Sequence, residues 1–319
     1  MNTILPPGTY ESRELAKRYG YDEWLVDRFL AYVPEVKEFL AKMERTPTQY
    51  IRVNTLKTTA EELRKRLEAK GFVLHPTILA EVLSVSFAPM SVGATTEYLL
   101  GHYYVQDLSS CITVDALDVE ENLQVLDIAA APGGKTTMIA QRMNNTGSIV
   151  ALEPSATRAR SMSFNLARCG VSNTCILDLP GEEIGRLGFK FDRVLLDAPC
   201  SCEGVIAKDV KRKTSHEPAD VEFCSNRQES LIAAAAGVVK PGGILVYSTC
   251  SFAPEENEAV VDSFLGKRTG ISVEPVEFGT PGLTEFQGIS FSKALKNTRR
   301  LYPHMHDTTG YYIAKLRID

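Results

Sequence analysis

The sequence lacks any run of about 18 apolar residues, the length that a membrane-spanning helix requires. Its first eight residues, MNTILPPG, contain neither a basic stretch nor an apolar segment long enough for export. The seven cysteines are odd in number and have no repeating spacing, which disfavours a disulfide framework and fits a reducing compartment. These absences predict a cytoplasmic protein that does not enter a membrane.

An excess of positive charge is also missing. Lys and Arg total 35 against 40 Asp and Glu, so the net charge of -5 gives no indication of a nucleic-acid partner. With 44% hydrophobic residues, the 319-residue chain can fill one large core or two smaller ones, and its composition excludes collagen-like and low-complexity proteins. Any contact with nucleic acid must therefore come from local clusters of basic residues.

Residues 1–100 are predicted to form the first domain, an N-terminal helical segment followed by a small α+β unit. The patterns are an alternating strand over 47–56, a charged amphipathic helix over 59–70, and one or two strands over 72–85. Glycines and polar residues mark a domain boundary near residue 100. The remainder, residues 101–319, forms the second predicted domain.

In residues 101–319, apolar strands alternate with helical periods. The predicted strands are 125–128, 149–153, 175–179, 191–198 and 244–250. Strands buried between helices on both faces indicate a Rossmann-like, doubly wound sheet that is mostly parallel. No helix follows the last predicted strand, 310–318, so we expect this strand to pair antiparallel, at the edge or inside the sheet.

The segment Asp127–Thr136 (DIAAAPGGKT) leaves a strand and enters a helix. Its small residues allow close approach of a ligand to the backbone, and the helix start attracts an anion. A phosphate-binding loop would need glycine at Ala129, and the dinucleotide pattern G-x-G-x-x-G is missing. The loop therefore favours a ligand other than a nucleotide phosphate.

An acidic residue closes the next predicted strand. Glu153 lies 19 residues beyond Gly134 (153 − 134), near the spacing of about 20 at which a carboxylate binds ribose hydroxyls. A nucleoside without phosphates that carries a carboxylate fits both features, which predicts S-adenosylmethionine. Asp178, at the end of the third strand, then accepts from the adenine amino group, and Arg158 anchors either Glu153 or the loop.

Two cysteines follow two other predicted strands. Cys200 stands in Asp197–Ser201 (DAPCS) and Cys250 in Tyr247–Ser251 (YSTCS), so both thiols are expected at the rim that carries the loop. A thiolate that adds to carbon 6 of a cytosine makes carbon 5 nucleophilic, and a second group must then help to remove the carbon-5 proton. Asp197 would stabilise the adduct and read the base edge. The alternative is that both cysteines only pack as small hydrophobic residues.

A metal site made of Cys200, Cys202, Cys224 and Cys250 is a further alternative. Structural zinc sites usually separate paired cysteines by two to four residues, whereas one residue separates Cys200 from Cys202. We therefore expect no metal.

Taken together, these motifs resemble the RNA cytosine-5 methyltransferase family of the Sun/Nop type, which includes RsmB-like and tRNA-modifying members. The segments that carry the resemblance span most of the chain: Arg52–Lys57, Gln106–Ser110, Asp127–Thr136, Asp197–Ser201, Tyr247–Ser251, Glu255–Glu258 and Gly310–Lys315. The resemblance implies a methyltransferase sheet preceded by a small RRM-like RNA-binding domain.

The resemblance also implies roles for individual residues. Cys250 would be the nucleophile, Cys200 would assist product release, and Asp197 would lie where cofactor and base meet. The methionine part of the cofactor would contact Ala129, Ala130, Ala131, Pro132, Gly133, Gly134 and Lys135, with the ribose at Glu153 and the adenine near Asp178. Two residues depart from the family pattern, because Cys202 replaces a usual Gly and Glu153 a frequent Asp.

A basic run follows the first of the two thiols and consists of Lys208, Lys211, Arg212 and Lys213. We expect this run, together with Arg300, to contact phosphates that flank an extruded base. No appended RNA-binding domain of the NusB or PUA kind is recognisable, which favours tRNA as substrate and leaves rRNA open. The sequence thus predicts a monomeric, SAM-dependent RNA cytosine-5 methyltransferase. The alternatives are methylation of another acceptor and a non-catalytic RNA-binding or assembly factor.

Overall fold

The computed structural model describes residues 8–215 and 217–319. Met1–Pro7, on which the expectation about export rests, and His216 lie outside these ranges. Contacts divide the chain into two compact units. The first unit comprises the residues up to Pro47, Ala198–Ile232 and Ser248–Ala314, and the second comprises Thr48–Asp197, Ala233–Tyr247 and Lys315–Asp319.

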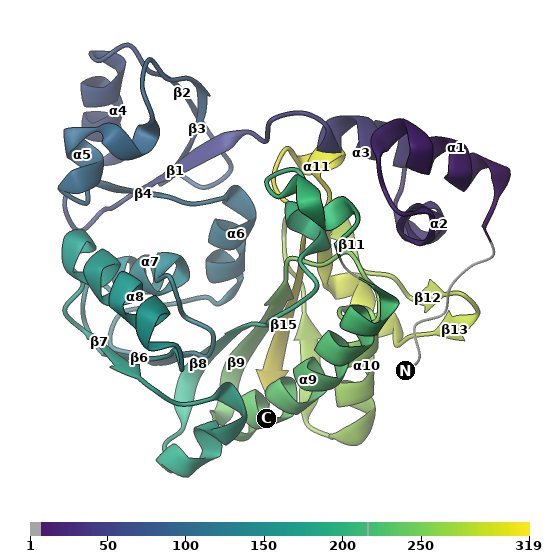
Figure 1. Cartoon of the computed structure of the whole chain (residues 1–319). Coiled ribbons are helices and arrows are strands. Elements are labelled where there is room, and N and C mark those ends of the chain that lie inside the picture. Colours follow the sequence, from purple (N-terminus) through teal and green to yellow (C-terminus); the bar gives the residue numbers. More distant parts are fainter. Residues whose placement is uncertain (1–7, 216) are drawn as a thin grey trace. The chain divides into compact units, whose positions relative to one another are not determined.

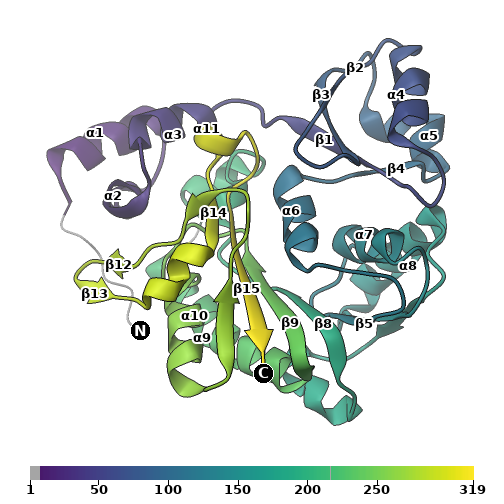
Figure 2. The same ribbon diagram turned by 180° about the vertical axis from the view of Figure 1, so that it is seen from behind.

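The second unit begins with a small antiparallel sheet. Its elements are β1 (Gln49–Val53), α4 (Ala60–Glu68), β2 (Val73–Pro76), β3 (Val82–Phe87), α5 (Thr96–Leu99) and β4 (Tyr103–Val105). The strand order β2–β3–β1–β4 and this succession of elements are ferredoxin-like. Helices α4 and α5 lie on the same side of the sheet in both views (Figures 1 and 2). The predicted α+β unit is confirmed, and its last strand lies beyond the predicted boundary near residue 100.

The same unit continues with parallel strands that alternate with helices. The elements are α6 (Leu108–Ala116), β5 (Gln124–Asp127), α7 (Gly134–Arg142), β6 (Ser148–Leu152), α8 (Ala156–Cys169), β7 (Thr174–Leu177), β8 (Phe191–Asp197) and β9 (Val239–Thr249). Strands β8, β5, β6 and β7 are neighbours in this order and pair in parallel. Asp127 is in register with Leu195 and Ala151, so the carboxyl ends of β5, β8 and β6 share one edge. The predicted doubly wound sheet is confirmed.

The first unit contains α1 (Tyr10–Tyr19), α2 (Glu23–Tyr32), α3 (Val36–Met43), most of α9 (Pro218–Gly237), α10 (Glu258–Lys267) and α11 (Pro303–His306). Its short strands are β10 (Ile271–Glu274), β11 (Thr280–Pro281), β12 (Glu285–Phe286), β13 (Ile289–Ser290) and β14 (Arg299–Leu301). Buried rings form its core, and Phe39 packs edge-on against both Phe29 and Phe252 with centroids 5.1 Å apart.

The last strand, β15 (Tyr311–Ile318), pairs antiparallel with β14. In the strand order it stands between β14 and β9, so it lies inside the large sheet (Figure 2). The sequence predicted an antiparallel strand and left its position open. Within the described ranges, no helix has both the length and the apolar character needed to cross a membrane.

Candidate active site

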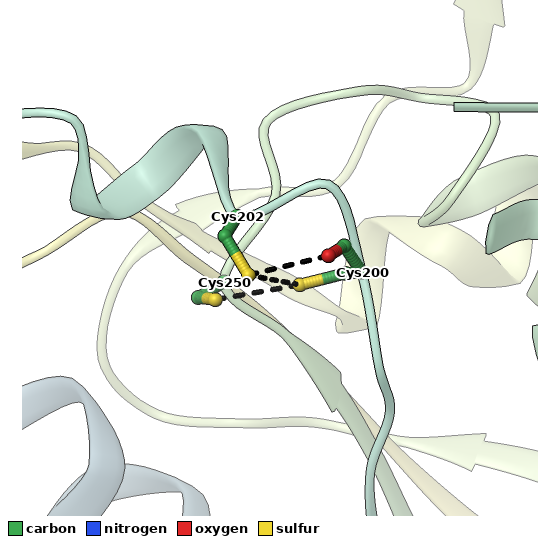
Figure 3. A group of neighbouring side chains, drawn as sticks. All are labelled: Cys200, Cys202 and Cys250. Carbon is green, nitrogen blue, oxygen red and sulfur yellow. Dashed lines mark hydrogen bonds between the residues drawn. The ribbon is translucent and has the colours of Figure 1, made fainter. Parts of the chain in front are cut away.

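Three thiols meet in the first unit (Figure 3). The sulfur of Cys200 lies 3.3 Å from that of Cys250 and 3.8 Å from that of Cys202. All three cysteines are half-buried. The structure therefore brings together the two cysteines that the sequence selected, and it adds Cys202 to them.

Backbone hydrogen bonds hold the two cysteine-bearing segments against each other. The amide of Ala198 donates to the carbonyl of Ser248 at 2.8 Å, and the amide of Gly204 donates to the carbonyl of Cys250 at 2.7 Å. A Cβ atom at Gly204 would lie 2.7 Å from the Cys250 carbonyl oxygen and closer still to that of Gly310. Glycine is therefore required at this position to let the two segments approach.

A buried carboxylate, that of Glu256, ties together the serines that follow the two cysteines. One of its oxygens accepts from the hydroxyls of Ser201, at 2.5 Å, and Ser251, at 2.7 Å. The other accepts from the amide of Ser201 at 2.9 Å and from the side-chain amide of Gln228 at 3.0 Å. The carboxylate thus fixes the residue next to each thiol.

The other members of the Glu255–Glu258 motif are buried as well. Arg28 donates both guanidinium nitrogens to Glu255, at 2.9 and 2.6 Å. Asn257 donates to the carbonyl of Ser251 at 2.9 Å. The sequence marked this motif only through the family resemblance. In the structure, Glu256 and Asn257 hold Ser251, the residue that follows Cys250.

Two ionisable groups at the thiols have shifted pKa values. The pKa of Cys200 is raised well above its usual value because its thiol is hydrogen-bonded to Cys202 and Cys250 and because the surrounding protein shields the sulfur from water. Burial raises the pKa of Glu256 from 4.5 to about 7. Cys200 is therefore a neutral thiol near neutral pH.

The predicted cofactor loop lies in the second unit, between β5 and α7. Gly133 has φ 96°, which favours glycine, and a Cβ there would meet Met162 at 3.2 Å. Buried Arg52 donates to the carbonyl of Gly134 at 2.8 Å and to the hydroxyl of Thr137 at 2.9 Å. The loop is thus held by a residue of β1 in the second unit's small sheet.

Three acidic residues lie at the carboxyl ends of strands β6, β7 and β8 of the second unit. Glu153 is 2% exposed and accepts from the amide of Ser155 at 2.9 Å. Arg158 lies 3.3 Å from Glu153 and donates to the carbonyl of Ala131 at 3.1 Å, so it anchors the carboxylate and the loop together. Asp178 is exposed directly after β7, and Asp197 ends β8.

Charges on the loop are paired within the same unit. The ammonium group of Lys135 lies 2.5 Å from Asp197. The hydroxyl of Thr136 donates to Asp127 at 2.7 Å, and burial raises the pKa of Asp127 to about 6. Lys135 and Asp197, which the sequence assigned separately, therefore form one ion pair.

The residues predicted to bind RNA divide into two groups. Lys208 and Lys211 are exposed, and half-buried Arg212 donates to the carbonyl of Ser201 at 3.0 Å. Lys213 is instead buried against Glu44 at 2.6 Å and the carbonyl of Tyr19.

Arg300 is 2% exposed and donates to Glu258 at 2.7 Å and to the carbonyl of Phe252 at 2.8 Å. The expected phosphate contacts of Lys213 and Arg300 are therefore wrong for this conformation. Both side chains contribute to the interior instead, and the counter-charges that hold them are distant in the sequence.

Comparisons with known proteins agree with these motifs. A family model described as 16S rRNA methyltransferase RsmB/F matches residues 114–317. A second model, for a ferredoxin-like domain of RsmF/B-like methyltransferases, matches residues 21–85.

The curated relatives include rRNA and tRNA enzymes. A 28S rRNA (cytosine-C(5))-methyltransferase of Mus musculus is 42% identical over 96% of this chain and 40% of its own length. A tRNA (cytosine(49)-C(5))-methyltransferase of Pyrococcus abyssi is 38% identical over 92% of this chain and 95% of its own. The chain thus spans about half or less of the length of the eukaryotic relatives that it matches, from 39% to 52%.

Solved structures show the same fold. A methyltransferase homolog protein from Pyrococcus horikoshii has a TM-score of 0.89 and 38% identity, covering 98% of this chain and 100% of that one. NSun6 from Pyrococcus horikoshii, solved with SFG, has a TM-score of 0.81 and 25% identity, covering 100% and 99%.

Proposed function

This chain belongs to the family of the rRNA methyltransferases RsmB/F, and we propose that it transfers a methyl group from S-adenosylmethionine to carbon 5 of a cytidine in RNA. The observation that carries the proposal is the 3.3 Å distance between the sulfurs of Cys200 and Cys250. Two thiols this close can act in turn on one pyrimidine ring.

The residues of the second unit fit the proposed methyl donor. Glu153 accepts from Ser155 and Arg158, and a carboxylate has room for further donors such as ribose hydroxyls. The first amides of α7 have no partner within the helix, which suits the donor's carboxylate. Asp178 is exposed and able to accept from an adenine amino group. When bound, S-adenosylmethionine supplies a methyl group on a positively charged sulfur.

In the proposed reaction, the thiolate of Cys250 adds to carbon 6 of the cytosine and pushes an electron pair toward carbon 5. Carbon 5 takes the methyl group and then carries both the methyl group and its original proton. The thiolate of Cys200 would take that proton, which restores the double bond as the bond between Cys250 and carbon 6 breaks and the sulfur of Cys250 leaves as a thiolate. Asp197 would stabilise the electron-rich ring, as the sequence predicts.

The raised pKa of Cys200 supports this division of roles. Only a thiolate is an effective nucleophile, so a thiol with a raised pKa is poorly suited to attack first. Cys200 must therefore give up its own proton before it can take the carbon-5 proton, and as a thiolate of high pKa it is then the stronger base. Attack by Cys250 and release by Cys200 are the roles that the family resemblance implies.

We further propose tRNA as the substrate, with rRNA as the alternative. Both RNA classes occur among the relatives, since the Pyrococcus abyssi tRNA enzyme is 38% identical over 92% of this chain and the Mus musculus rRNA enzyme is 42% identical over 96%. Exposed Lys208 and Lys211 follow Cys200 in the first unit and offer positive charge to the phosphates of a flipped nucleotide.

The test is methyl transfer from labelled S-adenosylmethionine to tRNA and rRNA transcripts, followed by bisulfite mapping of the product. We expect 5-methylcytosine in tRNA, and none with Cys250→Ala. Modification of rRNA alone would overturn the tRNA assignment, and methylation of a purine would overturn the proposed reaction.

A further inference from the structure

Cys202 is the third thiol of the cluster and has no part in the proposed reaction. Its sulfur donates to the carbonyl of Cys200 at 3.2 Å and lies 3.8 Å from the Cys200 sulfur. Its backbone has φ 62°, a region that costs most side chains about 1 kcal/mol and glycine almost nothing. The chain thus places a reactive side chain at a position where glycine would be the easier choice.

The three sulfurs have the spacing of ligands to one metal ion. At a Zn–S distance of about 2.3 Å, two sulfurs lie about 3.8 Å apart around a tetrahedral ion and about 4.0 Å apart in a trigonal plane. Here the sulfur separations are 3.3 and 3.8 Å from Cys200, and all three atoms lie within 4.8 Å of one another. The separation between Cys200 and Cys250 would have to open by about 0.5 Å (3.8 − 3.3) to reach the tetrahedral value, whereas that between Cys200 and Cys202 already has it.

The ligand set selects the kind of metal. Three sulfurs without an oxygen or imidazole ligand favour thiophilic ions over Mg²⁺ or Ca²⁺. Among the described residues, the group of possible metal ligands at this place is Cys200, Cys202 and Cys250, and Cys224 is not part of it. Three protein ligands leave a further coordination position for water, as in open zinc sites.

We propose that Cys200, Cys202 and Cys250 bind one thiophilic divalent ion, Zn²⁺ or Cd²⁺, as a three-thiolate site. Each thiol releases its proton to solvent, so the ion and three thiolates carry a net charge of −1 and no redox change occurs. Because protons must leave, affinity rises with pH. The ion would be bound by the sulfur of Cys250, which is also the sulfur that attacks the base. Metal binding and the RNA adduct therefore exclude each other. Only this inhibitory consequence rests on the proposed function.

The direct test is titration of the metal-free, reduced full chain with Cd²⁺, followed by the ultraviolet thiolate-to-cadmium band. We expect one ion per chain, and we expect Cys202→Gly to lose about a third of the band and to bind at least about tenfold more weakly. Glycine tolerates the backbone of residue 202, so this variant keeps the local fold. Cys224→Ser is the matched control and should titrate like the wild type.

Methyl transfer provides the second measurement. Zn²⁺ should inhibit the wild type reversibly, with activity restored by a chelator, and Cys202→Gly should require at least about tenfold more Zn²⁺ for half-inhibition. Equal cadmium bands in the wild type and Cys202→Gly would overturn the site. A normal cadmium titration in a protein that transfers no methyl group without metal would instead count against the proposed function, and would leave the metal site supported.

Discussion

Replacing Glu256 tests whether one buried carboxylate positions both catalytic segments. In Glu256→Gln, the amide keeps the shape of the side chain. The hydroxyls of Ser201 and Ser251 can turn from donating to accepting, so the four contacts survive without the charge. In Glu256→Ala, the amide of Ser201 loses its acceptor, whereas Gln228 keeps the carbonyl of Pro199 at 2.8 Å.

The size of each stability change follows from the burial of the Glu256 carboxyl group. An acid whose pKa rises from 4.5 to about 7 on folding binds more protons in the folded state across this range. The stability that this proton uptake provides is therefore complete below about pH 4.5 and is lost as pH rises through about 7. The free energy of unfolding of the wild type falls by up to about 3 kcal/mol over this range. Glu256→Gln does not titrate, so its stability does not fall for this reason. Glu256→Ala should cost about 3 kcal/mol at about pH 5, since it leaves a buried amide unpaired and opens a cavity.

Urea unfolding at about pH 5 and about pH 8 measures both effects. We expect Glu256→Gln to match the wild type at the lower pH and to be more stable at the higher one. Glu256→Ala should also form less covalent RNA adduct, because the segments that carry Cys200 and Cys250 lose their common anchor. The same pH dependence in Glu256→Gln and the wild type would refute the assigned titration. An unchanged adduct rate in a folded Glu256→Ala would refute the positioning role.

Three further predictions concern the cofactor loop and RNA. Glu153→Gln should bind S-adenosylmethionine at least about tenfold more weakly by calorimetry, because the charged acceptor for the ribose is lost; unchanged affinity would exclude a ribose contact. Arg52→Met should lower the free energy of unfolding by about 3 kcal/mol, since it leaves buried acceptors around the loop unpaired. A change below about 1 kcal/mol would show that the loop does not depend on the hydrogen bonds of Arg52. Lys208→Ala together with Lys211→Ala should weaken tRNA binding. The slope of the logarithm of the binding constant against the logarithm of salt concentration should become shallower by about 1 to 2, and an unchanged slope would show that these two lysines do not contact phosphates.

Local signals explain why much of the fold was predictable from the sequence. Helix α8 begins after Ser155, whose hydroxyl accepts from the amide of Arg158, and ends at Gly170 with φ 76°, as capping rules predict. The strands that it separates are short apolar runs. Strands β11, β12 and β13 span two residues each and have no periodicity to detect.

The errors came from contacts between distant residues. Lys213 and Arg300 belong to basic clusters in the sequence, but Glu44 and Glu258 neutralise them in the interior, 169 and 42 residues away. The sequence marked Glu256 only through the family resemblance and gave it no role, because its partner Ser201 lies 55 residues earlier. The sequence shows how many charged side chains a segment carries, but only the tertiary fold decides which of them face solvent.

The central claim is that Cys250 bonds to the base and Cys200 frees it, and trapping of the intermediate tests this most directly. Cys200→Ala, incubated with tRNA and S-adenosylmethionine and run on a denaturing gel, should accumulate a protein–RNA band that requires Cys250. Cys250→Ala and the double variant should show no band. Loss of activity in both single variants without any covalent band would contradict the account.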